Sequence, residues 1–293
     1  MPSIYLSPST QEFNLFYDGA GSEEYYMNLI ADAMEPYLTA SGIVYTRNTP
    51  EMTAATSILA SNAGTYDAHV ALHSNAAPES LAGKLRGIDI YYYPGSERSR
   101  RLADSMVAQL REIYPLPDKV QARPTTSIGE VSRTRAPAVL AELGYHDNPD
   151  DAAWIRSNIV PIARRLVMAL TNYFGIPFLE PEPILSATVD LGFGNLNIRS
   201  RPSLAAPIIG QAPDGAQVSV LGSWNGWYVI RYGNIEGYAR SEYITLNYSS
   251  SPVHFSADFL PMLCLCSVLF AQKRRFYRFI PKKYSCKLSS PVV

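Results

Sequence analysis

The chain has 293 residues, which is long for one ordinary domain and suits two. Hydrophobic residues make up 47% of it and charged residues 17%, so residues 1–247 are expected to fold, and long disordered segments are excluded there. The net charge of −1 argues against nucleic acid as a partner, and the cysteines, all after residue 263, exclude a disulfide framework in the preceding chain.

The first 178 residues alternate strand-like and helix-like patterns, as βαβ units do. Helices are expected between the Ser22 cap and the Gly42 stop, and at roughly 51–62, 96–113 and 150–174. Buried strands are expected at the short apolar runs Ile4–Leu6, Ile43–Tyr45, His69–His73, Ile88–Tyr93 and Ala138–Leu143. We therefore predict an α/β domain over residues 1–178, with a single, mostly parallel sheet flanked by helices.

The pattern changes after a segment rich in proline and glutamate, PFLEPEP at residues 177–183, which favours extended backbone. We place a linker at 179–185 and a small all-β domain at 186–247, because short strands and turn residues follow without a helical period. The tail, 248–293, has an apolar run, Phe259–Ala271, that is shorter than the ~20 residues needed to span a bilayer. A membrane-surface anchor is one alternative for the tail, but a poorly ordered tail, or sequence foreign to the original gene, fits better, and we assign it neither a role nor a membrane contact.

Candidate chemistry in the first domain points to a metal. The domain has no cysteine and no Gly-x-Ser-x-Gly elbow, so an activated nucleophile has little support. His73 and Glu142 stand near the ends of predicted strands, where open α/β sheets collect ligands, and Glu24 lies in the first turn of a helix. Each has an ordinary alternative: Glu24 as a solvated or capping residue, and His73 as a hydrogen-bonded histidine. Glu142 is harder to explain in this way, because burying an unpaired carboxylate costs several kcal/mol.

Four motifs in order resemble the zinc-dependent N-acetylmuramoyl-L-alanine amidases, over roughly residues 3–175. They are Glu24 shortly before Asn28–Leu29, the pair Thr46–Arg47, His73–Ser74–Asn75, and Glu142 within Pro137–Gly144 followed by Asn148. The resemblance implies that Glu24 and His73 bind Zn²⁺, that Glu142 is the catalytic acid and base, and that Asn75 contributes to substrate binding.

The first motif of that family is absent. Its first strand runs into an Asp-x-Gly-His-Gly loop whose histidine binds zinc, whereas this chain has Ser7–Pro8–Ser9–Thr10–Gln11. Gln11 is the candidate third ligand by position and His146 by donor chemistry, and an incomplete site is the remaining alternative. His69 shares a strand face with His73 but lies about 13 Å away along the strand, so we predict a structural role for it.

The second domain resembles bacterial SH3 domains, which commonly bind cell-wall peptide or glycan. The resemblance rests on Leu196–Pro202, Gly226–Val229 and Gly237–Tyr238. We expect Trp227 in the barrel core, and Trp224 and Tyr243 on an exposed face that binds the wall.

Together the two resemblances predict a peptidoglycan hydrolase that cleaves the amide bond between N-acetylmuramic acid and L-alanine. The alternatives are a wall-binding pseudoenzyme and a zinc peptidase with another substrate. We expect action at the bacterial cell wall; the start MPSIYLSPSTQ does not resemble a secretory signal, so the route of export and the oligomeric state stay open.

Overall fold

The computed structural model describes residues 1–247, which belong to one compact unit. The predicted apolar run and disorder of the tail fall outside the described residues. Among those that are described, no helix combines the length and hydropathy needed to cross a membrane.

A six-stranded sheet forms the centre of the first domain, in the order β2-β1-β3-β6-β4-β5. Its strands are β1 (Ser3–Pro8), β2 (Val44–Arg47), β3 (Ala68–Asn75), β4 (Ile88–Tyr92), β5 (Val120–Pro124) and β6 (Ala138–Tyr145). All neighbours are parallel except β4 and β6, which are antiparallel. The mostly parallel sheet and its five predicted strands are confirmed, and β5 is an additional edge strand.

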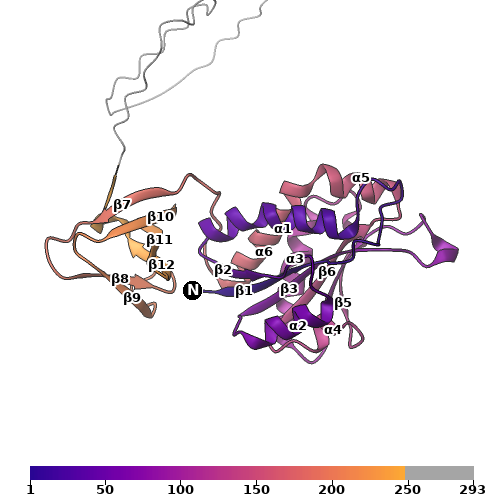
Figure 1. Cartoon of the computed structure of the whole chain (residues 1–293), viewed down its shortest axis with the longest axis horizontal. Helices are drawn as coiled ribbons and strands as arrows, with labels where there is room; N and C mark the ends of the chain where they lie inside the picture. Colours follow the sequence, from indigo (N-terminus) through magenta and orange to yellow (C-terminus); the bar gives the residue numbers. More distant parts are fainter. Residues whose placement is uncertain (248–293) are drawn as a thin grey trace, which may run out of the picture. The chain divides into compact units, whose positions relative to one another are not determined.

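Helices lie on both faces of this sheet (Figure 1). They are α1 (Glu23–Ala40), α2 (Ala54–Ala63), α3 (Glu97–Arg111), α4 (Gly129–Ser132), α5 (Pro149–Ser157) and α6 (Ile159–Phe174). Ser22 caps α1 by accepting a hydrogen bond from the Tyr25 backbone N–H, as its position before the helix predicts. The single helix expected at 150–174 is two helices, because Asn158 leaves the helical conformation (φ −127°, ψ 25°) and separates α5 from α6.

The two faces of the sheet differ in chemistry because successive side chains of a strand point to opposite sides. Leu6, Val70 and Ala141 belong to the large apolar core formed with α1, α3 and α6. The alternate positions carry His69, His73 and other polar groups on the face where α2 and α4 lie (Figure 1). The site described below is built on this second, polar face.

The second domain is a seven-stranded antiparallel sheet, in the order β13-β7-β10-β11-β12-β8-β9. Its strands are β7 (Leu185–Val189), β8 (Asn195–Arg199), β9 (Ile208–Pro213), β10 (Gln217–Trp224), β11 (Trp227–Tyr232), β12 (Ile235–Arg240) and β13 (Ile244–Leu246). Asn225 and Gly226, both with positive φ, form the two-residue turn between β10 and β11, as tight hairpins require. The predicted all-β domain is confirmed.

The three aromatic residues singled out in this domain lie as the sequence predicts. Trp227 is 6% exposed and packs in a small apolar cluster, whereas Trp224 is 38% and Tyr243 40% exposed.

Candidate functional site

His73 is the centre of a buried polar cluster on β3. Its Nδ1 lies 2.7 Å from Oε1 of Glu23, and its Nε2 lies 3.2 Å from Oε2 of Glu130. Burial alone would lower the pKa of His73, but the hydrogen bonds to Glu130 and Glu23 raise it well above its usual value. The imidazolium therefore donates to both carboxylates.

Glu23, the first residue of α1, lies against Nδ1 of His73, whereas Glu130 lies against Nε2. Its carboxylate accepts hydrogen bonds from Asn14 Nδ2 at 2.7 Å and Gln11 Nε2 at 3.4 Å, in addition to the contact with His73. Burial would raise the pKa of Glu23, but the contact with His73 and the surrounding donors lower it overall. Glu23 is 1% exposed and remains ionised in this environment.

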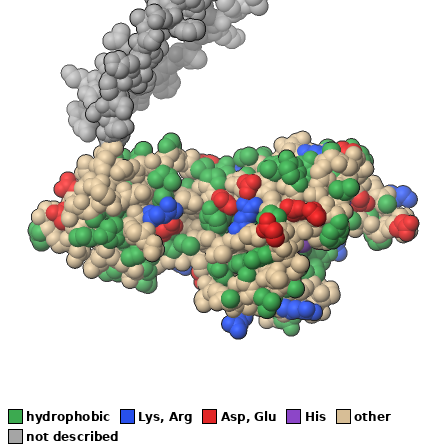
Figure 2. All heavy atoms as spheres, viewed as in Figure 1, with side chains coloured by type: hydrophobic (Ala, Val, Ile, Leu, Met, Phe, Trp, Pro, Cys, Tyr) green, Lys and Arg blue, Asp and Glu red, His purple; other side chains and the backbone are tan. Residues whose placement is uncertain are grey.

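Glu24, the predicted metal ligand, does not face His73 in the structure. Glu24 lines a separate surface depression that also includes Asn28 and Arg47, and the structure places Glu23 against His73 instead. Adjacent residues of an α-helix are rotated by about 100° around its axis, so Glu23 and Glu24 point in different directions. Around that depression Arg47 pairs with Asp32 and Glu35, and acidic and basic side chains lie together over α1 in Figure 2.

Of the two candidates for a third ligand, the structure brings Gln11 to the cluster and leaves His146 outside it. Gln11 Nε2 lies 3.3 Å from His73 Nδ1, while Gln11 Oε1 accepts a hydrogen bond from Asn14 Nδ2. His146 Nδ1 lies 3.0 Å from Ser74 Oγ and 2.9 Å from Ser74 O, and its ring stacks near Phe16. The Nδ1 of His146 thus already has hydrogen-bond partners in Ser74 of β3.

Glu130, which was not predicted from the sequence, links the two histidines of β3. Its Oε1 accepts a hydrogen bond from Ser7 Oγ and lies 3.3 Å from His69 Nε2, while its Oε2 faces His73. Burial would raise the pKa of Glu130, but His69 and His73 lower it overall. The signal for such a residue was present, because two buried imidazoles on one strand face need acceptors. His69 itself is fully buried, with Ser61 on its other nitrogen.

Glu142 lies beside His73 on the neighbouring strand, since the two residues are partners in the β3–β6 register. Its Oε2 is buried without a hydrogen-bond partner in the protein. Burial, aided by repulsion from Glu23 and Asp89 and opposed by His73, raises the pKa of Glu142 to about 7. This carboxyl group can therefore hold or release a proton near neutral pH.

A cavity of about 310 Å³ gives access to the cluster. Its lining includes Gln11, His73 and Glu130 together with Met52 and Phe13, whose side chain is 75% exposed. The remaining predicted residue, Asn75, ends β3, and its backbone oxygen accepts a hydrogen bond from the His146 N–H.

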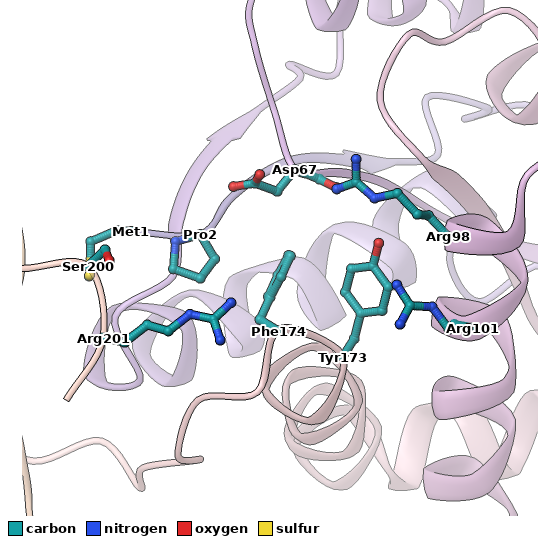
Figure 3. A pocket seen from close by; sticks show the side chains of 9 residues that line it. All are labelled: Met1, Pro2, Asp67, Arg98, Arg101, Tyr173, Phe174, Ser200 and Arg201. Carbon is teal, nitrogen blue, oxygen red and sulfur yellow. The ribbon is translucent and has the colours of Figure 1, made fainter. Parts of the chain in front are cut away.

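A second cavity, of about 340 Å³, lies elsewhere in the unit (Figure 3). Arg98 and Arg101 of α3 and Arg201 surround it, with Tyr173 and Phe174 at the end of α6. Its lining contains one carboxylate, Asp67, among these three arginines, and no histidine, so it does not repeat the pairing of imidazole and carboxylate found at His73.

The side chains around His73 supply too few strong ligands for a complete metal site. Within residues 1–247 no three histidine, cysteine, aspartate or glutamate side chains are grouped so as to hold a metal ion. One imidazole and one carboxylate converge there, and the third group in reach is the amide of Gln11.

Comparison with protein families gives two matches that divide the chain as the fold does. Residues 16–172 match the family model described as N-acetylmuramoyl-L-alanine amidase, and residues 194–245 match the bacterial SH3 domain. The first match begins after Gln11, so the loop that carries the unusual ligand candidate lies outside it.

Similar proteins cover only parts of the chain. YrvJ of Bacillus subtilis (strain 168) is 39% identical over 66 residues, which are 22% of this chain and 13% of YrvJ. LytH of Staphylococcus aureus is 30% identical over 93 residues, 32% of this chain and 30% of LytH. Both are named as amidases, and the chain spans well under half the length of each.

Among solved structures, the catalytic domain of CwlV, an N-acetylmuramoyl-L-alanine amidase from Paenibacillus polymyxa, superimposes with a TM-score of 0.53 at 16% identity. The match covers 60% of this chain and 100% of that domain. At this identity the likeness shows the fold, and it confirms the predicted α/β architecture of the first domain.

Proposed function

Because the chain belongs to the N-acetylmuramoyl-L-alanine amidase family, we propose that it hydrolyses the amide bond between N-acetylmuramic acid and the L-alanine of the stem peptide. The observation that carries this proposal is Glu142, whose buried, unpartnered Oε2 lies beside the His73 cluster and titrates near neutral pH. A carboxyl group with these properties suits general acid–base catalysis. The bacterial SH3 domain supports action at the cell wall.

We include zinc in the proposal. The side chains around His73 fit a zinc site, although one of the three ligands, the amide of Gln11, is a weak donor. Glu23 Oε1 and His73 Nδ1 would bind the ion, and the Gln11 side chain, whose Nε2 faces His73 here, would turn its amide oxygen toward the ion as the third ligand. Glu130, on the other nitrogen of His73, matches the carboxylate that commonly orients a metal-binding histidine. When bound, zinc would supply Lewis-acid polarisation of the scissile carbonyl and a more acidic water.

Side chains of the protein transfer the proton and orient the proposed zinc ligands. The Glu142 carboxylate takes a proton from the attacking water and returns it to the leaving nitrogen of L-alanine. Glu130 fixes the His73 ring by its hydrogen bond to Nε2, and Asn14 fixes the Glu23 carboxylate and the Gln11 amide. The cavity beside His73 gives the substrate a place to enter.

The test combines metal analysis with product analysis on purified peptidoglycan. The full chain should contain near-stoichiometric zinc and release stem peptides with a free L-alanine amino group, and Glu142→Gln should retain zinc while losing the release. Exposed Glu79→Gln is the matched control, and it should behave as the wild type. Undiminished release by Glu142→Gln contradicts the proposed role of this residue.

A wall-binding pseudoenzyme is the second candidate, and the amide at Gln11 in place of a third strong donor favours it. Absence of zinc from the purified chain, together with retained binding to cell walls, would support this candidate over the hydrolase. A zinc peptidase with another substrate would bind zinc but release no stem peptide.

A further inference from the structure

The strand next to Glu142 carries another acid whose position the proposed reaction does not explain. Asp89 of β4 is the antiparallel partner of Glu142 on β6, so the two carboxyl groups lie on the same face of the sheet. Asp89 is 8% exposed, and its negative charge adds to the repulsion around Glu142. Two acids side by side in a nearly buried position are unfavourable unless one is paired.

Asp89 has its pair in Arg123 on the edge strand β5. Arg123 Nε donates to Asp89 Oδ1 at 2.5 Å, and the Arg123 side chain is 50% exposed. Within residues 1–247 the two terminal nitrogens of this guanidinium have no hydrogen-bond acceptor. Asp89 therefore holds the planar group at Nε and leaves the donors of its terminal nitrogens available to another partner.

An ordinary surface ion pair would account for Arg123 but not for Asp89. Such pairs contribute about 0–1 kcal/mol, and they form between exposed side chains that need no buried partner. Here one member is buried beside the proposed catalytic acid, at a position where an apolar residue would cost less. The pair is better explained by what the guanidinium binds.

We propose that Arg123 is a substrate-binding residue, oriented by Asp89, whose terminal nitrogens receive a carboxylate of the stem peptide. This rests on the proposed amidase function, and it specifies which part of the substrate the site selects. A guanidinium fork suits a carboxylate because two parallel hydrogen bonds form in one plane.

The geometry of the sheet indicates which residue of the stem peptide carries the carboxylate that Arg123 binds. Strand β5 lies two strand spacings, roughly 10 Å, from β6, and Arg123 pairs with Tyr91, two residues along β4 from Asp89, so its side chain reaches back along the sheet to Asp89. An extended peptide advances about 3.3 Å per residue, so Arg123 meets a carboxylate about two or three residues beyond the bond at Glu142. The nearest free carboxyl in this range is that of the second stem residue, which is therefore the group that we assign to Arg123.

Binding in a hydrolysis-deficient background separates this inference from the proposed reaction. In the full-length Glu142→Gln protein, calorimetry would compare two muramoyl tripeptides that differ only in a free or amidated α-carboxyl at the second residue. We expect the free carboxyl to bind about tenfold tighter or more, and Arg123→Gln to remove that preference. Arg123→Lys should restore it in part, because the charge remains and the fork is lost.

Arg100→Gln is the matched control, since Arg100 lies on α3 with a 61% exposed side chain and should leave the preference unchanged. Equal binding of the two peptides by the parent protein, or an equal loss of both on Arg123→Gln, would overturn the inference. Failure of the wild type to hydrolyse either peptide, with the binding preference intact, would count against the amidase function and leave the role of Arg123 supported.

Discussion

Replacing Glu142 with glutamine should separate the stability of this domain from its activity. Burial raises the pKa of Glu142 from 4.5 to about 7, so the folded protein keeps a proton that the unfolded chain releases at lower pH. As the pH rises from about 4.5 to 7, ionisation of Glu142 therefore stabilises the unfolded state relative to the folded state, and the free energy of unfolding falls. A pKa shift of this size corresponds to about 3 kcal/mol of stabilisation of the folded state, and this stabilisation is fully lost above pH 7.

The amide introduced by Glu142→Gln has no proton to release, so the variant should become more stable relative to the wild type over this pH interval. Chemical denaturation of metal-free protein at pH 4.5 and pH 8 would measure the difference between the two proteins at each pH. We expect that difference to change by about 3 kcal/mol in favour of Glu142→Gln, whereas Glu79→Gln, at an exposed site, should show no such change. A constant difference between pH 4.5 and pH 8 would refute the assignment of Glu142 as a buried acid with a raised pKa.

The remaining predictions concern the ligands and the wall-binding face. Glu23→Ala should reduce zinc content and activity by at least tenfold, whereas Glu24→Ala should leave both near wild-type values; metal analysis of the two purified variants distinguishes them. Gln11→His supplies an imidazole at the weak ligand position and should tighten zinc binding, measured by competition with a chelator; weaker binding would exclude Gln11 from the metal site. Trp224→Ala in the full chain should reduce sedimentation with purified cell walls without lowering the melting temperature, because Trp224 is 38% exposed.

Local patterns were sufficient to predict most of the first domain. Apolar runs predicted five strands, of which β2 is an edge strand and is not buried, and the Ser22 cap marked the start of α1. Strand β5 was missed because it lies at the sheet edge, where only its first residue, Val120, is buried, and it has no apolar run. The break at Asn158 was missed because a short interruption between two amphipathic helices leaves the 3.6-residue period almost unchanged.

The site was harder to predict because its members meet only in the folded chain. His73 and Glu142 were recognisable from their positions near strand ends, and the structure makes them neighbours. Choosing between Glu23 and Glu24 depends on the rotation of α1 about its axis, which the two adjacent glutamates do not reveal. Glu130 joins the cluster from a short helix far along the chain, so its role depends on the packing of α4 against the sheet.

The charges of the cluster lead to one more prediction about zinc. Without a metal, the protonated His73 compensates Glu23 and Glu130, and Glu142 is left to hold its own proton. Zinc binding would require His73 to release its Nδ1 proton, and the ion would place two positive charges near the carboxylates. The pKa of Glu142 should then fall, so the pH-dependent stability difference between the wild type and Glu142→Gln should shrink in saturating zinc. An unchanged difference would mean that zinc does not bind at Glu23 and His73, because a dication so close to Glu142 has to favour its ionised form.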